Sequence, residues 1–196
     1  MPTGNFTAEI KREIIRSGLE NTCCKTAALS AFLRATGSVI RSGGFIGFEF
    51  VTESERSAEF IMGLLEDIYG AELQIVQAVE DVRNGKNRLV FRCLSEKSLY
   101  ILSELGIAER SGEDVVLSFD IDKYLVENEC CKIAYIKGAF LGGGSCSVPN
   151  TENARSGYHL EIVFSSGTVA DSFCLLLEHY EILAKRVARK GTYVIY

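Results

Sequence analysis

Two stretches of the chain alternate apolar and polar residues, which is the pattern of half-buried strands. They are Phe48-Glu49-Phe50-Val51 and Leu160-Glu161-Ile162-Val163. Each is followed by a segment whose apolar residues have helical spacing, around Leu64-Leu65-Glu66 and around Leu176-Leu177-Glu178. Because the same two elements follow each other twice in the same order, the pattern indicates an internal repeat.

The repeat is plainest upstream of these strands. Asn21-Thr22-Cys23-Cys24-Lys25 recurs as Asn128-Glu129-Cys130-Cys131-Lys132, 107 residues later. Both segments predict the start of a helix, since an asparagine at the N-cap can accept a hydrogen bond from a free N–H group of the first turn. Gly37 and the run Gly142-Gly143-Gly144 are expected to end these helices by adopting the left-handed conformation.

Each half therefore reads as helix, two strands, helix, two strands, which predicts a mixed α/β (α+β) fold. We expect one domain over 1–196, in which repeat one spans about 21–106, a linker about 107–127 and repeat two about 128–196.

Two further helices and two turns complete the expected elements. One helix is predicted near Thr7–Arg16, and another over about Glu96–Leu105, capped by Ser95 and ended by Gly106. Asn84-Gly85-Lys86 and Arg189-Lys190-Gly191 occupy matching positions and predict turns between strands, because Asn-Gly is a strong hairpin signal.

Small residues recur at every fourth position of the two predicted core helices. They are Ala27, Ala31 and Ala35 in the first copy, and Ala134, Gly138 and Gly142 in the second. That spacing places them on one helix face, and small side chains let two helices approach closely. We expect the helices to pack on these stripes about a pseudo-two-fold axis. The alternative, two unrelated core helices rich in small residues, is disfavoured by the matched positions.

Composition restricts the class of protein. The chain has 196 residues, 47% of them apolar, and only two prolines, which predicts one globular domain. Neither a signal peptide nor a membrane-spanning run is apparent, and seven cysteines are an odd number, so we expect reduced thiols in a cytoplasmic protein. The net charge of −5 argues against holding nucleic acid by bulk charge, so any such binding must be local or come from another domain.

The paired cysteines could bind a metal ion, because they lie near helix starts where the dipole lowers a thiol pKa. Adjacent residues on a helix point about 100° apart, so one pair alone chelates poorly and a Cys₄ site needs both pairs. Zinc ligands are usually separated by two or more residues, which favours buried apolar packing instead. No metal and no cofactor is therefore predicted, and Cys93, Cys146 and Cys174 are expected in the core.

Other catalytic signatures are missing from the sequence. His159 and His179 match no nucleophile motif and are expected to be structural. The glycine run 142–144 follows a helix and lacks the lysine of a phosphate-binding loop, which argues against nucleotide binding.

Basic residues gather at the two predicted hairpins, whereas acidic residues concentrate over 53–81 and 104–129. Matched basic hairpins could contact phosphates on both sides of a duplex. The alternative, solvated hairpin faces, stays open. The candidate DNA-binding residues are Arg83, Lys86, Arg88, Arg92, Lys185, Arg186, Arg189 and Lys190.

The segment Tyr135–Ser145 resembles the LAGLIDADG motif of homing endonucleases, and Leu29–Ser38 is a more divergent copy. Two αββαββ halves that meet on a tight helix pair are the architecture of that fold. With the Cys-Cys motifs and Tyr158-His159-Leu160-Glu161-Ile162, the chain resembles the WhiA family, bacterial transcription regulators of sporulation and cell division. The resemblance covers nearly the whole chain, and it implies a C-terminal helix-turn-helix DNA-binding domain that would follow Tyr196.

Active homing endonucleases carry an acidic residue at the end of each motif helix, where it holds a divalent metal ion on DNA. The resemblance aligns that position with Thr36 and Gly143, neither of which supplies a carboxylate. Residues 25–48 and 131–151 contain no acid, and the nearest matched pair, Glu49 and Glu161, is expected at solvent-facing strand positions. The sequence therefore predicts no enzyme.

We expect the N-terminal, catalytically inactive domain of a WhiA-like regulator that assists DNA or protein binding. Its expected partners are double-stranded DNA, mainly through the C-terminal domain, and another regulatory protein, with no membrane contact. A monomer is expected, because a single-chain pseudo-dimer has no need to dimerise, and the protein is expected to be cytoplasmic and nucleoid-associated. The alternative is a protein-interaction or sensor module without DNA contact; a residual nuclease is disfavoured by the missing carboxylates.

Overall fold

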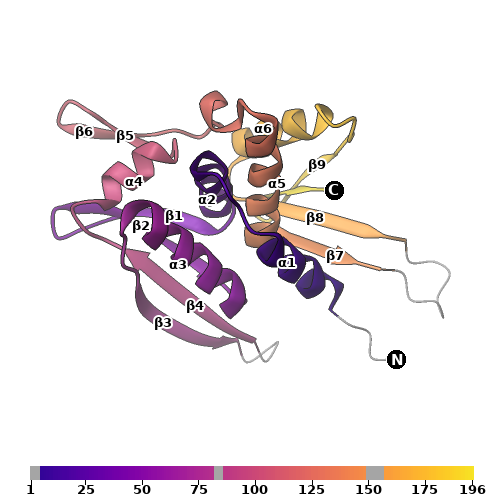
Figure 1. Cartoon of the computed structure of the whole chain (residues 1–196), viewed down its shortest axis with the longest axis horizontal. Helices are drawn as coiled ribbons and strands as arrows, with labels where there is room; N and C mark the ends of the chain where they lie inside the picture. Colours follow the sequence, from indigo (N-terminus) through magenta and orange to yellow (C-terminus); the bar gives the residue numbers. More distant parts are fainter. Residues whose placement is uncertain (1–4, 82–85, 149–156) are drawn as a thin grey trace.

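Two four-stranded antiparallel sheets lie on either side of a central pair of helices in this computed structural model (Figure 1). The structure describes residues 5–81, 86–148 and 157–196, with the backbone alone for 78–81, 86 and 87. Each sheet comes from one half of the chain, and each half supplies one of the two central helices.

The first half builds its sheet in the order β1-β2-β4-β3. Phe48 and Phe50 of β2 lie on either side of Glu49 and are buried, so one face of the strand packs on the core. The elements are α2 (Thr22–Thr36), β1 (Gly37–Ser42), β2 (Phe45–Thr52), α3 (Glu55–Tyr69), β3 (Gln74–Asp81) and β4 (Lys86–Cys93).

The second half repeats this topology in the order β7-β8-β10-β9. Ile162 of β8 is buried in the position that Phe50 holds in β2, and Phe164, two residues further along, is buried as well. The elements are α5 (Glu129–Gly143), β7 (Gly144–Ser147), β8 (His159–Phe164), α6 (Gly167–Glu178), β9 (Arg186–Arg189) and β10 (Thr192–Ile195). The predicted α+β fold of two αββαββ repeats is confirmed.

Two helices stand outside the repeats, as the sequence predicts. Helix α1 (Phe6–Ser17) packs Ile14 against the cores of both halves, so it belongs to neither repeat alone. Helix α4 (Ser98–Glu104) begins two residues later than expected, with Lys97 at its N-cap. The Ser95 hydroxyl accepts from the Lys97 N–H in the turn before the helix.

The segment between the repeats contains structure that the sequence pattern does not predict. Strands β5 (Ala108–Ser111) and β6 (Asp114–Leu117) form a hairpin whose turn places Gly112 at φ 64°. A 3₁₀ helix, η1 (Lys123–Val126), then leads into α5. Positive φ is cheap only for glycine, so the Ser-Gly pair at 111–112 is the signal that marks this hairpin.

Helices α2 and α5 pack against each other with their backbones in close approach. A Cβ atom on Gly138 would lie 2.1 Å from the carbonyl oxygen of Ala28, and one on Gly142 would lie 3.0 Å from Cβ of Ala35. Ala27, Ala31 and Ala134 are buried in the same core cluster. The predicted packing on small residues is confirmed, although Gly138 meets Ala28, which lies outside the predicted stripe of Ala27, Ala31 and Ala35.

The helix ends differ from the sequence-based expectation. Asn21 and Asn128 do occupy the N-cap positions, but neither side chain makes a capping hydrogen bond. Gly37 and Gly144 have φ of −93° and −81°, so each chain passes directly from helix into strand without a left-handed residue. Glycine is required at position 144 for lack of space instead, since a Cβ there would lie 2.4 Å from the Phe140 ring.

Within the described residues, every helix is too short or too polar to cross a bilayer.

Candidate nucleic-acid interface

Each sheet has an open face opposite the one that packs on its helices. Side chains alternate between the faces, so Glu49 and its cross-strand partner Arg92 lie on the open face while Phe50 and Phe91 lie in the core. By the same alternation, Glu161 and Arg189 lie on the open face of the second sheet.

A groove of about 910 Å³ lies where α2 and α5 end, between the open faces of the two sheets. Its floor contains Ala35 and Thr36 from α2 and the glycine run 142–144 from α5. Val51 and Arg88 border it on the first sheet, and Ser145 borders it on the second. Helix α1 forms a further wall with Lys11, Arg12 and Ile15. The groove therefore collects residues from both repeats and from the N-terminal helix.

Basic side chains outnumber acidic ones in this groove. Among its described lining residues, Lys11, Arg12, Arg56 and Arg88 are basic, and Glu53 is the one acid. Nε of Arg88 lies 3.6 Å from Glu53 Oε1, and both side chains remain partly exposed. A chain with net charge −5 thus has a locally positive groove at the centre of its two sheets.

Thr36 and Gly143, the positions that the motif resemblance aligns with nuclease carboxylates, both lie in the groove. Thr36 donates its hydroxyl hydrogen bond back to the Phe32 carbonyl oxygen at 3.0 Å, within its own helix. A Cβ on Gly143 would lie 2.4 Å from the carbonyl oxygen of Val163, so no side chain fits there unless the backbone moves. The described lining offers no pair of carboxylates that could hold Mg²⁺ between the helix ends.

The structure separates the candidate residues of the first hairpin. Arg88 reaches the central groove. Arg92 is held by Glu49, whose Oε1 lies 2.5 Å from Nη2. Lys86 begins β4, but its side chain and the whole of Arg83 lie outside the described residues, as does the Asn84-Gly85 turn.

The second hairpin is better defined. Lys190 and Gly191 form the turn of β9–β10 with φ of 49° and 83°, the two positive values of a type I′ turn. Arg189 and Lys190 are exposed, and so is Lys185. Arg186 instead lies on the helix side of the sheet, where Nε lies 2.8 Å from Asp171 and the guanidinium stacks over Tyr193 at 5.2 Å.

The matched acids Glu49 and Glu161 lie on the open faces, at partly buried rather than fully solvated positions. Each has a polar partner: Arg92 for Glu49, and His159 for Glu161 at 2.6 Å. Comparison of the two repeats identifies Glu49 and Glu161 but not their partners. Arg92 faces Glu49 from the neighbouring strand, and His159 lies two residues before Glu161 on the same strand.

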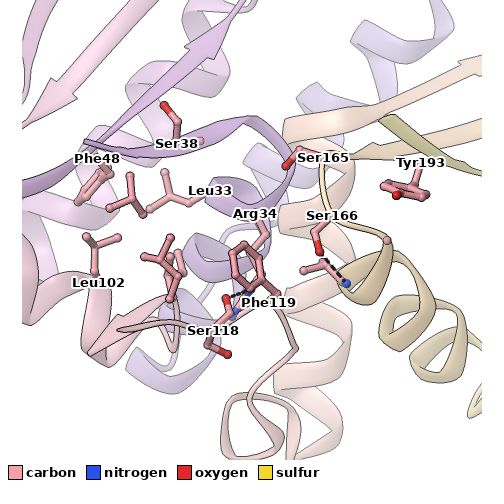
Figure 2. Close-up of a pocket in the computed structure, with 16 residues that line it drawn as sticks. Leu33, Arg34, Ser38, Phe48, Leu102, Ser118, Phe119, Ser165, Ser166 and Tyr193 are labelled. Atoms are coloured by element: carbon pink, nitrogen blue, oxygen red, sulfur yellow. Dashed lines mark hydrogen bonds between the residues drawn. The ribbon is translucent and has the colours of Figure 1, made fainter. Parts of the chain in front are cut away.

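A second, more apolar pocket of about 490 Å³ lies between the repeats and the linker. In Figure 2, Phe48 and Leu102 line one side, and Ser165, Ser166 and Tyr193 line the other. Arg34 lies between them and is 8% exposed. It donates to the carbonyl oxygens of Gly106 at 2.6 Å and Ser118 at 3.1 Å, and burial lowers its pKa.

Arg34 therefore ties the end of α2 to both ends of the linker hairpin. It is a charged residue in the last turn of a mostly apolar helix, which the sequence interpretation passes over. The basic residues Lys11, Arg12 and Arg56 were also missed, because the groove that unites them exists only once α1 and α3 meet the helix ends.

Both histidines are engaged in polar contacts at the surface. His159 pairs with Glu161, and His179 Nε2 lies 2.8 Å from Glu129 Oε1 at the start of α5. Glu129 also contacts Lys132 and accepts from the Tyr180 hydroxyl at 3.1 Å; these contacts, Lys132 foremost, lower the pKa of Glu129.

The fold compares well with solved structures. The N-terminal LAGLIDADG domain of DUF199/WhiA aligns with a TM-score of 0.62 at 17% identity, over 98% of this chain and 84% of that one. Full-length DUF199/WhiA from Thermatoga maritima aligns with a TM-score of 0.66 at 18% identity, over 95% of this chain and 55% of that one. The repeats and their helix pair thus place the chain in the class of LAGLIDADG-like proteins.

Sequence comparison narrows the class. The WhiA N-terminal LAGLIDADG-like domain matches residues 22–108, and the WhiA LAGLIDADG-like domain matches residues 132–196. A relative from Bacillus cytotoxicus, named a probable cell division protein WhiA, is 34% identical over 98% of this chain. The chain belongs to the WhiA family. It spans 58% of the length of that relative.

Proposed function

We propose that this chain is the DNA-contacting, non-cleaving part of a WhiA-type transcription regulator that acts in cell division and sporulation. The observation that carries the proposal is the composition of the central groove. It occupies the ends of the paired helices, where a nuclease of this fold would act, and its described lining has basic walls and no pair of carboxylates.

The groove favours holding a phosphate backbone over cutting it. Hydrolysis in this class of fold needs metal-bound oxygen ligands at the helix ends, where this chain has Thr36 and Gly143. Arginine and lysine walls contact phosphates without reading base sequence, so this domain would position DNA while another domain selects the site.

The acidic remainder of the chain limits the strength of such binding. With a net charge of −5, the domain alone should bind duplex DNA weakly and with a strong dependence on salt. Arg12, Arg56 and Arg88 are exposed groove residues, and Arg189 and Lys190 are exposed on the second sheet's hairpin. Both sets are therefore candidates for phosphate contacts.

The test is duplex-DNA binding by this chain across a salt series, with Mg²⁺ present and cleavage scored in the same samples. Arg56→Glu with Arg88→Glu reverses the groove, and Arg189→Glu with Lys190→Glu reverses the hairpin. Arg110→Glu, on the exposed linker hairpin, is the matched control. We expect both double reversals to weaken binding and flatten its salt dependence, with the control unchanged and no cutting.

Two results would overturn the proposal. Binding that is absent even at low salt would remove DNA as a partner of this domain, and Mg²⁺-dependent cutting would make it a nuclease.

A protein-interaction module is the second candidate, and one feature favours it. Ile182 and Leu183, between α6 and β9, are adjacent apolar residues that are 51% and 84% exposed. Exposed apolar side chains of this size are typical of contact surfaces when they are contiguous. This candidate would be supported if Leu183→Asp in the full-length regulator abolished its function in cell division while DNA binding stayed intact.

A further inference from the structure

Four cysteine sulfurs meet at one end of the paired helices. The Sγ atoms of Cys23, Cys24, Cys130 and Cys131 all lie within 4.8 Å of one another. We propose that they form a Cys₄ site for a thiophilic divalent metal ion of the zinc class, which joins the two repeats. The proposal does not depend on DNA binding by the groove.

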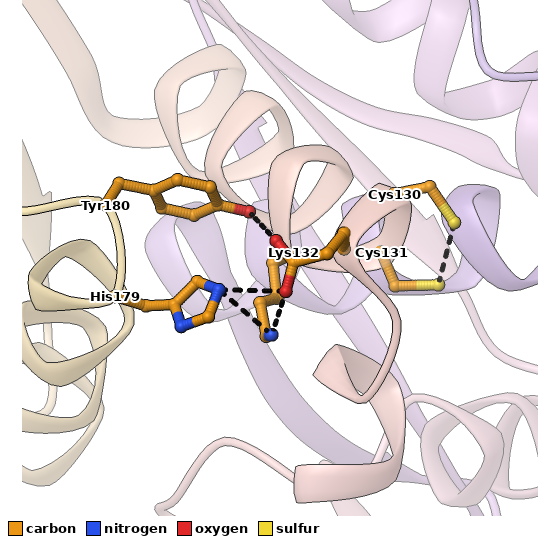
Figure 3. Close-up of polar contacts among 6 residues, drawn as sticks. Cys130, Cys131, Lys132, His179 and Tyr180 are labelled. Carbon is orange, nitrogen blue, oxygen red and sulfur yellow. Dashed lines mark hydrogen bonds and ion pairs between the residues drawn. The ribbon is translucent and has the colours of Figure 1, made fainter.

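The spacing of the sulfurs fits tetrahedral coordination with little movement. Zn–S bonds of about 2.3 Å in a tetrahedron place neighbouring sulfurs about 3.8 Å apart. The sulfurs of Cys130 and Cys131 lie 4.0 Å apart (Figure 3). Side-chain rotations that move the sulfur atoms by a few tenths of an ångström to about 1 Å would therefore bring all four to coordination distance of one ion.

The duplication explains how two adjacent pairs become four ligands. Cys23 and Cys24 are the second and third residues of α2, and Cys130 and Cys131 hold the same places in α5. Because α2 and α5 pack about a pseudo-two-fold axis, each pair faces its counterpart. A single pair is a poor chelate, as the sequence indicates, but the helix packing supplies the other half of the site.

One residue of each pair is buried and the other is exposed. Cys24 and Cys131 are 5% and 1% exposed and belong to the core cluster that contains Ala27 and Ala134. Cys23 and Cys130 are exposed, which gives an ion a route to the cluster. The arrangement anchors two ligands rigidly and leaves two able to adjust.

The surroundings favour thiolates. Both helices direct their N-terminal ends at the cluster, and their positive dipole ends stabilise negative charge there. The N-cap side chains of Asn21 and Asn128 make no capping hydrogen bond. A hydrogen bond from Cys24 lowers the pKa of Cys130.

Burial opposes ionisation of the inner pair. It raises the pKa of Cys24 to about 11, with the hydrogen bond to Cys130 as the next cause, and it also raises the pKa of Cys131. The ion must therefore displace protons: four thiols release four protons, and a divalent ion on four thiolates leaves a net charge of −2. Metal affinity should accordingly rise with pH.

Neighbouring charges do not compete for the ion. Glu129 precedes Cys130, but its carboxylate is engaged by Lys132, His179 and Tyr180 (Figure 3). The cluster contains sulfur alone, and thiolates select zinc-class or cuprous ions over Mg²⁺ and Ca²⁺.

The site is remote from the groove. Cys24 and Ala35 lie on α2 eleven residues apart, which corresponds to about 16 Å along a helix. An ion bound by the cysteines therefore cannot serve DNA cleavage at the helix ends. Its role would be to clamp α2 to α5.

The experiment uses the full chain purified under reducing conditions and stripped of metal. Zn²⁺ and Co²⁺ are the probes. We expect one ion per chain, and the Co²⁺ form should show the sulfur-to-cobalt charge-transfer and visible bands of a tetrahedral thiolate complex. Zn²⁺ should protect four of the seven thiols from a thiol reagent and raise the thermal midpoint.

Matched variants separate the cluster from the other thiols. Cys23→Ser and Cys130→Ser each remove one exposed ligand with little risk to folding. Mutation of residues that only support metal ligands typically weakens metal binding by roughly 10- to 100-fold. Loss of a ligand itself, as in these two variants, should weaken Zn²⁺ binding by more than that. Cys146→Ser with Cys174→Ser, two partly exposed thiols outside the cluster, should leave binding unchanged.

Three results would overturn the proposal. They are uptake of neither ion by the reduced chain, a Co²⁺ spectrum without thiolate bands, and conversion of the four thiols by mild oxidation to disulfides that Zn²⁺ does not prevent. The last outcome would assign the cluster to redox chemistry instead. Circular dichroism of each variant shows whether lost binding reflects a lost fold.

Discussion

At the scale of single residues, lack of space rather than backbone conformation explains why glycine occupies key positions in α5. Gly138 and Gly143 have negative φ values, yet each faces a backbone oxygen that a Cβ atom would strike, at 2.1 Å and 2.4 Å respectively. At Gly143 the same constraint leaves no room for any side chain unless the backbone moves. Close backbone contacts therefore require glycine both in the helix pair, at Gly138, and in the groove, at Gly143.

Gly138→Ala should destabilise the chain. The new methyl group must push α5 away from the Ala28 carbonyl, and overpacking of this kind costs about 1–3 kcal/mol or more. Chemical denaturation measures the change in unfolding free energy.

Gly63→Ala is the control for that change. Gly63 is an exposed glycine inside α3 with no atom within 4 Å of its hypothetical Cβ. Alanine there should be neutral or stabilise the chain by up to about 1 kcal/mol, because alanine has the higher helix propensity. Equal effects of the two substitutions would show that α2 and α5 are not in close contact.

At the scale of elements, helix α1 is joined to the second sheet by one side chain. The Thr7 hydroxyl donates to the Cys146 carbonyl oxygen at 2.9 Å and accepts from the Cys146 N–H at 2.8 Å. These bonds take the place of a strand partner at the β7 edge, and they position Lys11 and Arg12 along the groove.

Thr7→Val should therefore loosen α1 from β7. It keeps the shape of the side chain but removes both hydrogen bonds, at a cost of about 1–2 kcal/mol. We expect faster hydrogen exchange at the Cys146 amide and faster proteolysis within α1. Thr7→Ser retains the hydroxyl and should behave as the parent; if it behaves as Thr7→Val, the methyl contact rather than the hydroxyl anchors the helix.

At the scale of the whole molecule, the two repeats share their cores. Tyr135 of α5 and Cys24 of α2 belong to one buried cluster, whereas Leu141 of α5 is buried in the other with Phe32 of α2. Arg34 adds hydrogen bonds from α2 to the linker. Neither repeat encloses its own apolar surface.

The halves should consequently fail to fold when they are separated. Residues 1–127 and 128–196, produced alone, would expose the packed faces of α2 and α5, and the shorter piece is too small to bury an adequate core. Co-expression should restore a complex with the circular dichroism and cooperative unfolding of the whole chain. A folded, monomeric fragment of residues 1–127 would contradict this expectation.

The sequence by itself determined the elements and their duplication, because apolar periodicity and repeated motifs are local records of which face is buried. It also predicted the helix pair, since matched Ala27, Ala31 and Gly138 positions permit close approach. The linker hairpin and the exact start of α4 were not predicted, because short turns and helix ends carry weak local signals.

Only the tertiary structure decided which side chains meet. Lys11, Arg56 and Arg88 come from three elements to border one groove, while Arg92 and Arg186 are neutralised by partners that no sequence spacing reveals. The four cysteines likewise converge only because two helices pack side by side with their N-terminal ends together. Contacts between segments far apart in the chain depend on packing geometry, and a linear pattern does not contain that geometry.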